Sequence, residues 1–128
     1  FTSLRGHRSL NYPSYRSNRL YGRHQVQHFR DALSAHGFKY HTSQSAMSYV
    51  THFNPTSLPS RNEEGLAIFS KFPIVDASYK LLSRNYARPA QHQRAVLRAQ
   101  VKLETGHMVG VYTTHLSLEE SARNVQVR

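Results

Sequence analysis

The chain has no cysteine and few acidic side chains. Its 128 residues include 7 Asp and Glu, against 17 Lys and Arg and 9 His. The absence of cysteine excludes disulfide bonds, zinc sites built on thiolates and a cysteine nucleophile, and it leaves the redox compartment open. Seven carboxylates are also a small supply for metal binding or general acid–base chemistry. No apolar run is long enough to span a membrane as a helix, and no signal segment opens the chain.

The shortage of acids gives the chain a net charge of +10. Asp31 is the only acid among residues 1–62, and residues 1–23 hold five Arg and no acid. Residues 1–23 have no helical or strand periodicity, and Ser, Asn, Gly and Pro interrupt them. This composition predicts a basic loop or disordered arm. Its Arg and Tyr side chains could contact nucleic acid, or the segment is a solvated loop.

The length of the chain fits one domain, and the helix and strand patterns lie in residues 24–128. A helix is expected over residues 24–36, where apolar side chains recur on one face and Gly37 follows. The sequence Ser-Leu-Glu-Glu over residues 117–120 is a capping box, which predicts a second helix from about residue 118 to the end.

Strands are expected between these helices. Alternating or short continuous apolar patterns predict them, and prolines and polar residues predict a loop over 54–62. The expected strands cover residues 38–42, 46–50, 65–70, 74–82, 94–103 and 108–114.

The last two of these strands form a hairpin around Thr105-Gly106. If Glu104 faces His107, Val96 lies opposite His115, and Arg94 and His115 meet on one face at the open end. A slip of one residue would separate them. Glu64 directly precedes the strand 65–70, at a strand end where α/β sites usually form.

This trio has a chemical logic. Arg94 can hold a phosphate oxygen with its planar donors, His115 can transfer a proton near neutral pH, and Glu64 can orient the histidine or help to order a metal. The alternative is structural. In that reading His115 ends a strand, Glu63 and Glu64 are a solvated pair, and Arg94 is an edge arginine.

Three segments resemble the endonuclease/exonuclease/phosphatase family, the superfamily of DNase I and exonuclease III. Residues 63–75, EEGLAIFSKFPIV, resemble the family segment EGLAILSRYPIV. Residues 92–99, HQRAVLRA, resemble its HQR…L.A strand, and residues 111–118, VYTTHLSL, resemble V.NTHLSL. The three occur in the family's order, and Arg123 and Gln126 fit the helix that follows.

The resemblance implies a fold and an activity. Residues 24–128 would be a partial domain of this family, part of a four-layer α/β sandwich with two mixed sheets packed face to face and helices outside. The activity would be Mg²⁺-dependent hydrolysis of a phosphodiester, in nucleic acid or a lipid head group, with no organic cofactor. His115 would contact the scissile phosphate, Glu64 (or Glu63) would orient His115 and favour its protonated form, and Arg94 would support phosphate contact.

Several family segments have no counterpart here. The chain lacks the QEV-like segment with the main Mg²⁺ ligand, the GDFN segment and the closing SDH pair. It also opens on Phe1 rather than Met. We therefore expect an internal fragment of a longer hydrolase, inactive alone. The rival expectation is a non-catalytic basic module that binds nucleic acid or an anionic surface.

Overall fold

The computed structural model describes residues 2–3, 24–51, 60–88 and 91–128. The described chain contains both strands and helices, with five consecutive strands between the two helices, so the predicted mixture of α and β structure is confirmed. The elements are β1 (Thr2–Ser3), α1 (Gln25–Ser34), β2 (Tyr40–Thr51), β3 (Ser60–Ser70), β4 (Ile74–Leu81), β5 (Ala95–Lys102), β6 (Met108–Thr114) and α2 (Glu120–Gln126). Neither helix of this described part is long and apolar enough to cross a membrane.

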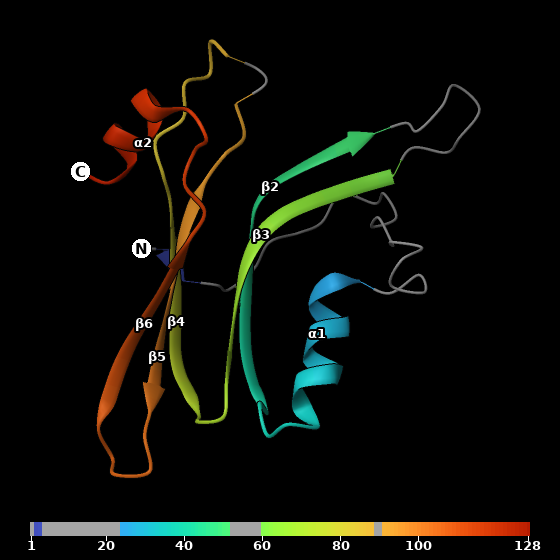
Figure 1. Cartoon of the computed structure of the whole chain (residues 1–128), viewed down its shortest axis with the longest axis vertical. Helices are drawn as coiled ribbons and strands as arrows, with labels where there is room; N and C mark the ends of the chain where they lie inside the picture. Colours follow the sequence, from blue (N-terminus) through green and yellow to red (C-terminus); the bar gives the residue numbers. More distant parts are fainter. Residues whose placement is uncertain (1, 4–23, 52–59, 89–90) are drawn as a thin grey trace.

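The strands form two sheets. One has the order β1-β4-β5-β6, and the other is the β2–β3 hairpin. Every pairing among the described strands is antiparallel, whereas the family resemblance implies mixed sheets. Figure 1 shows the hairpin beside the larger sheet, with α1 on its far side and α2 at the end where β4 and β6 finish. The four-layer sandwich remains a prediction.

The basic segment predicted over residues 1–23 lies mostly outside the described residues. Its described part, Thr2 and Ser3, pairs with Tyr79 and Ser78 as β1 at the edge of the larger sheet. The predicted loop over 54–62 is partly described, and there it is wrong, because β3 begins at Ser60.

The core lies between the sheets. Alternate residues of β5 are buried, as its sequence pattern predicts, and Leu97 is fully buried. Leu97 and Ala99 pack with Ile68 of β3 and Tyr79 of β4. Because buried apolar area supplies most of the stability of such a fold, these few side chains hold the hairpin against the sheet.

The β2–β3 hairpin contains a bulge. Ser45 pairs with Gly65 and Met47 pairs with Glu64, so Ala46 has no partner across the hairpin. A Cβ on Gly65 would collide with the backbone oxygen of Gln44, so glycine is required for this close approach. The two separate strands predicted at 38–42 and 46–50 are therefore one bulged strand. Bulges increase local twist and redirect side chains, and this one lies beside Glu64.

The β5–β6 turn is one residue away from its predicted register. Lys102 pairs with Met108, and Leu103 N–H donates to the carbonyl of His107 at 2.8 Å. Gly106 has a φ of 84°, which completes a three-residue loop. The predicted pairing of Glu104 with His107 is wrong, and Val96 pairs with Thr114 rather than with His115.

The second helix begins later than predicted. Its N-cap residue is Glu119, without a side-chain cap, and Ser117 Oγ instead accepts the N–H of Glu119 at 3.2 Å. Ser117 N–H donates to Gln126 Oε1 at 2.9 Å, so the end of α2 returns to the residues before it. The predicted capping box is wrong because the Ser117 hydroxyl accepts the N–H of Glu119, in a turn before the helix starts. The first helix is confirmed, and Gly37 has a φ of 88°.

Candidate functional site

A cavity of about 400 Å³ lies where the bulged hairpin meets the open end of β5 and β6. Glu64 reaches it from β3. Arg94 and His92 come from the residues directly before β5, and His115 comes from the residue directly after β6. Three segments distant in the sequence therefore supply its chemistry.

Glu64 is held by three side chains. Tyr49 OH donates to its Oε1 at 3.2 Å, and His92 Nδ1 lies 2.8 Å from its Oε2. Arg94 Nη1 lies 3.9 Å from the same Oε2. Burial alone would raise the pKa of Glu64, but the hydrogen bonds from His92 and Tyr49 and the charge of Arg94 outweigh it and lower the pKa. Glu64 is therefore a carboxylate at neutral pH.

The same arrangement acts on Tyr49. Burial raises the pKa of its phenol, and the hydrogen bond and negative charge of Glu64 raise it further. The phenol therefore stays protonated at neutral pH and donates to Glu64. Its ring also lies 5.9 Å from the His92 ring, centre to centre, which restricts the orientation of the imidazole.

Arg94 and His115 are in direct contact. Arg94 Nη1 lies 3.1 Å from His115 Nδ1, and the Arg94 side chain is only 12% exposed. A guanidinium has donors and no acceptor, so His115 Nδ1 must accept this hydrogen bond. The neutral tautomer with its proton on Nε2 satisfies that contact and offers an N–H to a ligand.

The structure brings the three predicted residues together, though not by the predicted route. Arg94 and His115 meet despite the different register, because both lie outside the paired residues of β5 and β6. Glu64 does not orient His115 directly. Its hydrogen-bond partners are Tyr49 and His92, and Arg94 lies between it and His115. The expected protonated form of His115 is also not the form that the Arg94 contact favours.

The sequence analysis missed Tyr49 and His92. His92 is two residues before Arg94, so an extended backbone places both side chains on one side. Asn62, the partner of Tyr49, is two residues before Glu64, which places Tyr49 on the face of Glu64. The spacing of two residues from Arg94 is enough to predict that His92 lies near the site. The position of Tyr49 could not be predicted in the same way, because it depends on the register shift at the bulge.

Gln93 fixes the segment between His92 and Arg94. It is buried, and its Nε2 donates to the carbonyls of Leu82 at 2.6 Å and of Arg94 at 2.9 Å. Leu82 N–H in turn donates to the Arg94 carbonyl at 2.8 Å. These hydrogen bonds fix the backbone between His92 and Arg94, so both side chains are held where they line the cavity.

Magnesium ligands can be sought among the described residues. Mg²⁺ prefers oxygen ligands in octahedral geometry. No group of three or more metal-ligating side chains occurs in the described ranges. Both carboxylate oxygens of Glu64 already accept hydrogen bonds. The cavity is lined by the carboxylates of Glu63 and Glu64, two imidazoles and a guanidinium, and the guanidinium with the neighbouring imidazole can donate to an anion.

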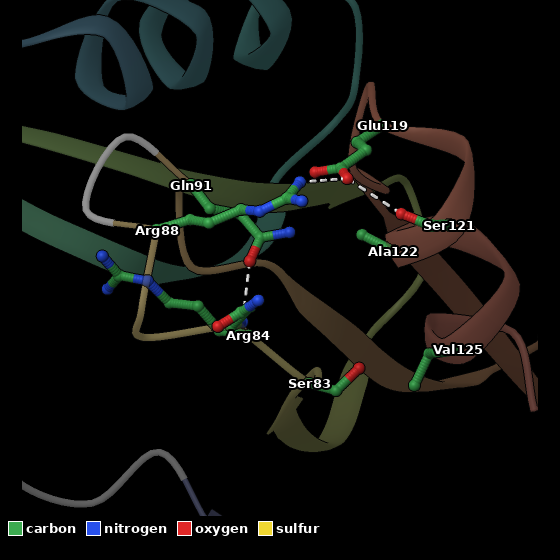
Figure 2. Close-up of a pocket in the computed structure, with 9 residues that line it drawn as sticks. Ser83, Arg84, Arg88, Gln91, Glu119, Ser121, Ala122 and Val125 are labelled. Carbon is green, nitrogen blue, oxygen red and sulfur yellow. Dashed lines mark hydrogen bonds and ion pairs between the residues drawn. The ribbon is translucent and has the colours of Figure 1, made fainter.

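A second cavity, of about 360 Å³, lies between α2 and the segment after β4 (Figure 2). Arg88 pairs there with Glu119, and Ser121 Oγ donates to the same carboxylate at 2.9 Å. The hydrogen bond from Ser121 has the larger effect, and together with the one from Arg88 it lowers the pKa of Glu119. The pairing of Arg88 with Glu119 links α2 to the segment after β4.

Comparison with protein-family models, curated proteins and solved structures finds no match of any of the three kinds. The resemblance rests on the three sequence segments themselves. The function is therefore argued from the chemistry of the cavity.

Proposed function

We propose that this chain is part of a metal-dependent phosphoester hydrolase of the endonuclease/exonuclease/phosphatase type and carries the groups that hold the phosphate. The observation that supports this most is the contact between Arg94 and His115 at the edge of the cavity. It leaves an Nε2–H on His115 and further guanidinium donors on Arg94 for an anion.

This pair suits a phosphoryl group. Arg donors match the geometry of phosphate oxygens, and a charge-assisted hydrogen bond is about twice as strong as a neutral one. Donors that are already fixed before the ligand binds also stabilise the charge that develops on phosphoryl oxygens during substitution at phosphorus. In this proposal Glu64 holds His92 and helps to keep Arg94 in place.

The fold proposal goes with the functional one. The two packed antiparallel sheets and the helix α1 beside the hairpin would be part of a four-layer α/β sandwich. The magnesium ion implied by the resemblance would supply polarisation of the phosphodiester.

The first experiment measures binding of inorganic phosphate and of bis(4-nitrophenyl) phosphate by NMR. We expect His115→Ala and Arg94→Lys each to raise the dissociation constant about 10–100-fold, the equivalent of one hydrogen bond to a charged group. His107→Ala is the matched control, because His107 is an exposed histidine at the other end of the same hairpin. Hydrolysis of the diester with Mg²⁺ by a longer chain that supplies the missing family segments, lost when that chain carries His115→Ala, would support the enzyme directly.

The competing function is a non-catalytic basic module, which the charge of +10 favours. Such a module would bind an oligonucleotide with a steep salt dependence, because each neutralised phosphate releases counterions. It would bind equally well after His115→Ala. Salt-sensitive binding that ignores His115 and Arg94, together with no binding of the small diester, would replace the hydrolase proposal with this one.

A further inference from the structure

Arg94 lies between two acceptors, His115 and Glu64, and forms a hydrogen bond with only the first of them. Its Nη1 lies 3.1 Å from His115 Nδ1 and 3.9 Å from Glu64 Oε2, and the second distance is too long for a hydrogen bond. A carboxylate this close to a guanidinium ordinarily closes to a bidentate hydrogen-bonded pair. The Arg94 side chain is only 12% exposed, so water screens little of that attraction. Other contacts must therefore hold the Glu64 carboxylate back.

Two side chains hold this carboxylate, one at each of its oxygens. Tyr49 OH donates to Oε1 at 3.2 Å. His92 Nδ1 lies 2.8 Å from Oε2, and because an ionised carboxylate can only accept, this nitrogen carries a proton and donates. The Tyr49 ring also lies 5.9 Å from the His92 ring, centre to centre. Tyr49 therefore restrains Glu64 both directly and through His92.

We propose that Tyr49 is a positioning residue of the phosphate site, which holds Glu64 back from Arg94 so that the Arg94 donors remain available to a phosphoryl group. This inference rests on the proposed function and deepens it. Tyr49 is not among the described residues that line the cavity, so it acts through Glu64 rather than by touching a ligand. Neither the composition nor the three resembling segments assigns a role to Tyr49.

The loss of this one hydroxyl group has consequences for both anion donors. Without it, Oε1 of Glu64 is free to turn towards the guanidinium and form the bidentate pair. Donors of Arg94 are then used within the protein, and the carboxylate neutralises its charge. His115 Nδ1 loses the donor that selects its tautomer, so Nε2 no longer carries a proton in every molecule. The hydroxyl of Tyr49 thus keeps Arg94 and His115 ready for a phosphate.

The variants for the test can be matched closely. Tyr49→Phe removes only the hydroxyl and keeps the ring beside His92. Tyr40→Phe is the control, because Tyr40 lies on the same strand, β2, and is 40% exposed. Glu64→Gln supplies a second background, since a neutral amide attracts Arg94 much less than a carboxylate does. If Tyr49 acts through the charge of Glu64, the effect of Tyr49→Phe disappears in that background, as a double-mutant cycle measures.

The first measurement reads the histidine tautomers without a ligand, at about pH 8, where free histidine side chains are mostly neutral. Two-bond ¹⁵N–¹H correlation spectra of the ¹⁵N-histidine-labelled full chain distinguish protonated from unprotonated ring nitrogens. In the unmodified chain and in Tyr40→Phe, we expect His115 as the single Nε2–H form and His92 as the Nδ1–H form. In Tyr49→Phe, we expect a mixture of both tautomers of His115. The single form should return when Glu64→Gln is added to Tyr49→Phe.

The second measurement is the dissociation constant of inorganic phosphate, determined by NMR for the same variants. We expect Tyr49→Phe to raise it about 3–10-fold, the equivalent of one net hydrogen bond. Tyr40→Phe should change it by less than about twofold, and so should Tyr49→Phe when it is introduced into the Glu64→Gln background.

Two results would overturn the role of Tyr49. One is a single Nε2–H form of His115 that persists in Tyr49→Phe, because Arg94 then stays with His115 without the hydroxyl. The other is an equal change in phosphate affinity, or none, in both backgrounds, because the effect of Tyr49 then does not pass through the Glu64 charge. Failure of the unmodified chain to bind phosphate would instead contradict the proposed function, so the two failures are distinguishable.

Discussion

At the scale of single residues, the cavity is organised by side chains that can hydrogen-bond in one way only. A guanidinium donates and an ionised carboxylate accepts, so each fixes the tautomer of the histidine that it touches. Glu64 is central because it meets Tyr49, His92 and Arg94. The Glu64 carboxylate thus connects Tyr49 and His92 with Arg94, which in turn contacts His115.

Glu64 should make stability depend on pH. Its folded pKa is lowered from an ordinary value of 4.5, so its contribution is present above about pH 4.5 and is lost as the pH falls through the folded pKa. We expect the difference in free energy of unfolding between the unmodified chain and Glu64→Gln to shrink on acidification. Urea unfolding at a series of pH values from about 7 to about 3 measures it.

The His92→Gln variant is the companion measurement. The hydrogen bond from His92 is the largest of the effects that lower the pKa of Glu64. Its removal should therefore weaken the same pH dependence. If the difference in free energy of unfolding between the unmodified chain and Glu64→Gln stays constant from about pH 7 to about pH 3, the partners of Glu64 do not lower its pKa.

At the scale of elements, the bulge in the β2–β3 hairpin determines where Glu64 lies. Ala46 is the extra residue, and the pairing moves by one position between Ser45 and Met47. The side chains beyond the bulge, Tyr49 and Glu64 among them, are placed on the face that meets the start of β5. A regular hairpin of the same residues would exchange the two faces.

Gly65→Ala tests the bulge. Its Cβ would collide with the Gln44 oxygen and lie 2.9 Å from Ser45 Cα, both of them backbone atoms that cannot rotate away. We expect a destabilisation of about 1–3 kcal/mol in urea unfolding, and a loss of the His92 tautomer as Glu64 moves.

Gly110→Ala is the matched control for that substitution. Gly110 is also a strand glycine, but the nearest atom to its Cβ is a ring carbon of Tyr112 at 3.4 Å, on a side chain that can shift. Its effect should stay within about 0.5 kcal/mol. Equal effects of the two substitutions would show that close approach at the bulge is unimportant.

At the scale of the whole molecule, the described part of the chain has a small buried core and many exposed apolar side chains. Ile68, Tyr79, Leu97 and Ala99 form the buried cluster. On β6, by contrast, Met108 and Val109 are 47% and 41% exposed. With so few buried side chains, each carries a large share of the stability, and the net charge of +10 adds repulsion that opposes it.

Leu97→Ala tests this dependence. Leu97 is fully buried between the sheets, and removing such a side chain costs about 2–5 kcal/mol. We expect urea unfolding to show a loss of this size, which is enough to unfold a chain of marginal stability. Leu118→Ala is the control, since Leu118 is 85% exposed and should change stability by less than about 0.5 kcal/mol.

Much of the fold follows from local pattern. The alternation along β5, the bounds of β6, the helix before Gly37 and the α/β class are all predicted correctly, because each depends on side chains within a few residues of one another. Arg94, His115 and Glu64 were also selected from the sequence alone. Their residue types and their places at strand ends were sufficient to single them out.

What needed the tertiary structure is the way these residues are connected. The bulge at Ala46 and the three-residue turn before His107 change the register, and both depend on how two strands approach one another. The partners of Glu64 come from β2 and from the segment before β5, at distances of 15 and 28 residues in the sequence. Local periodicity carries no information about such long-range pairing. Only the tertiary structure therefore determines that Glu64 contacts His92 and that Arg94 contacts His115.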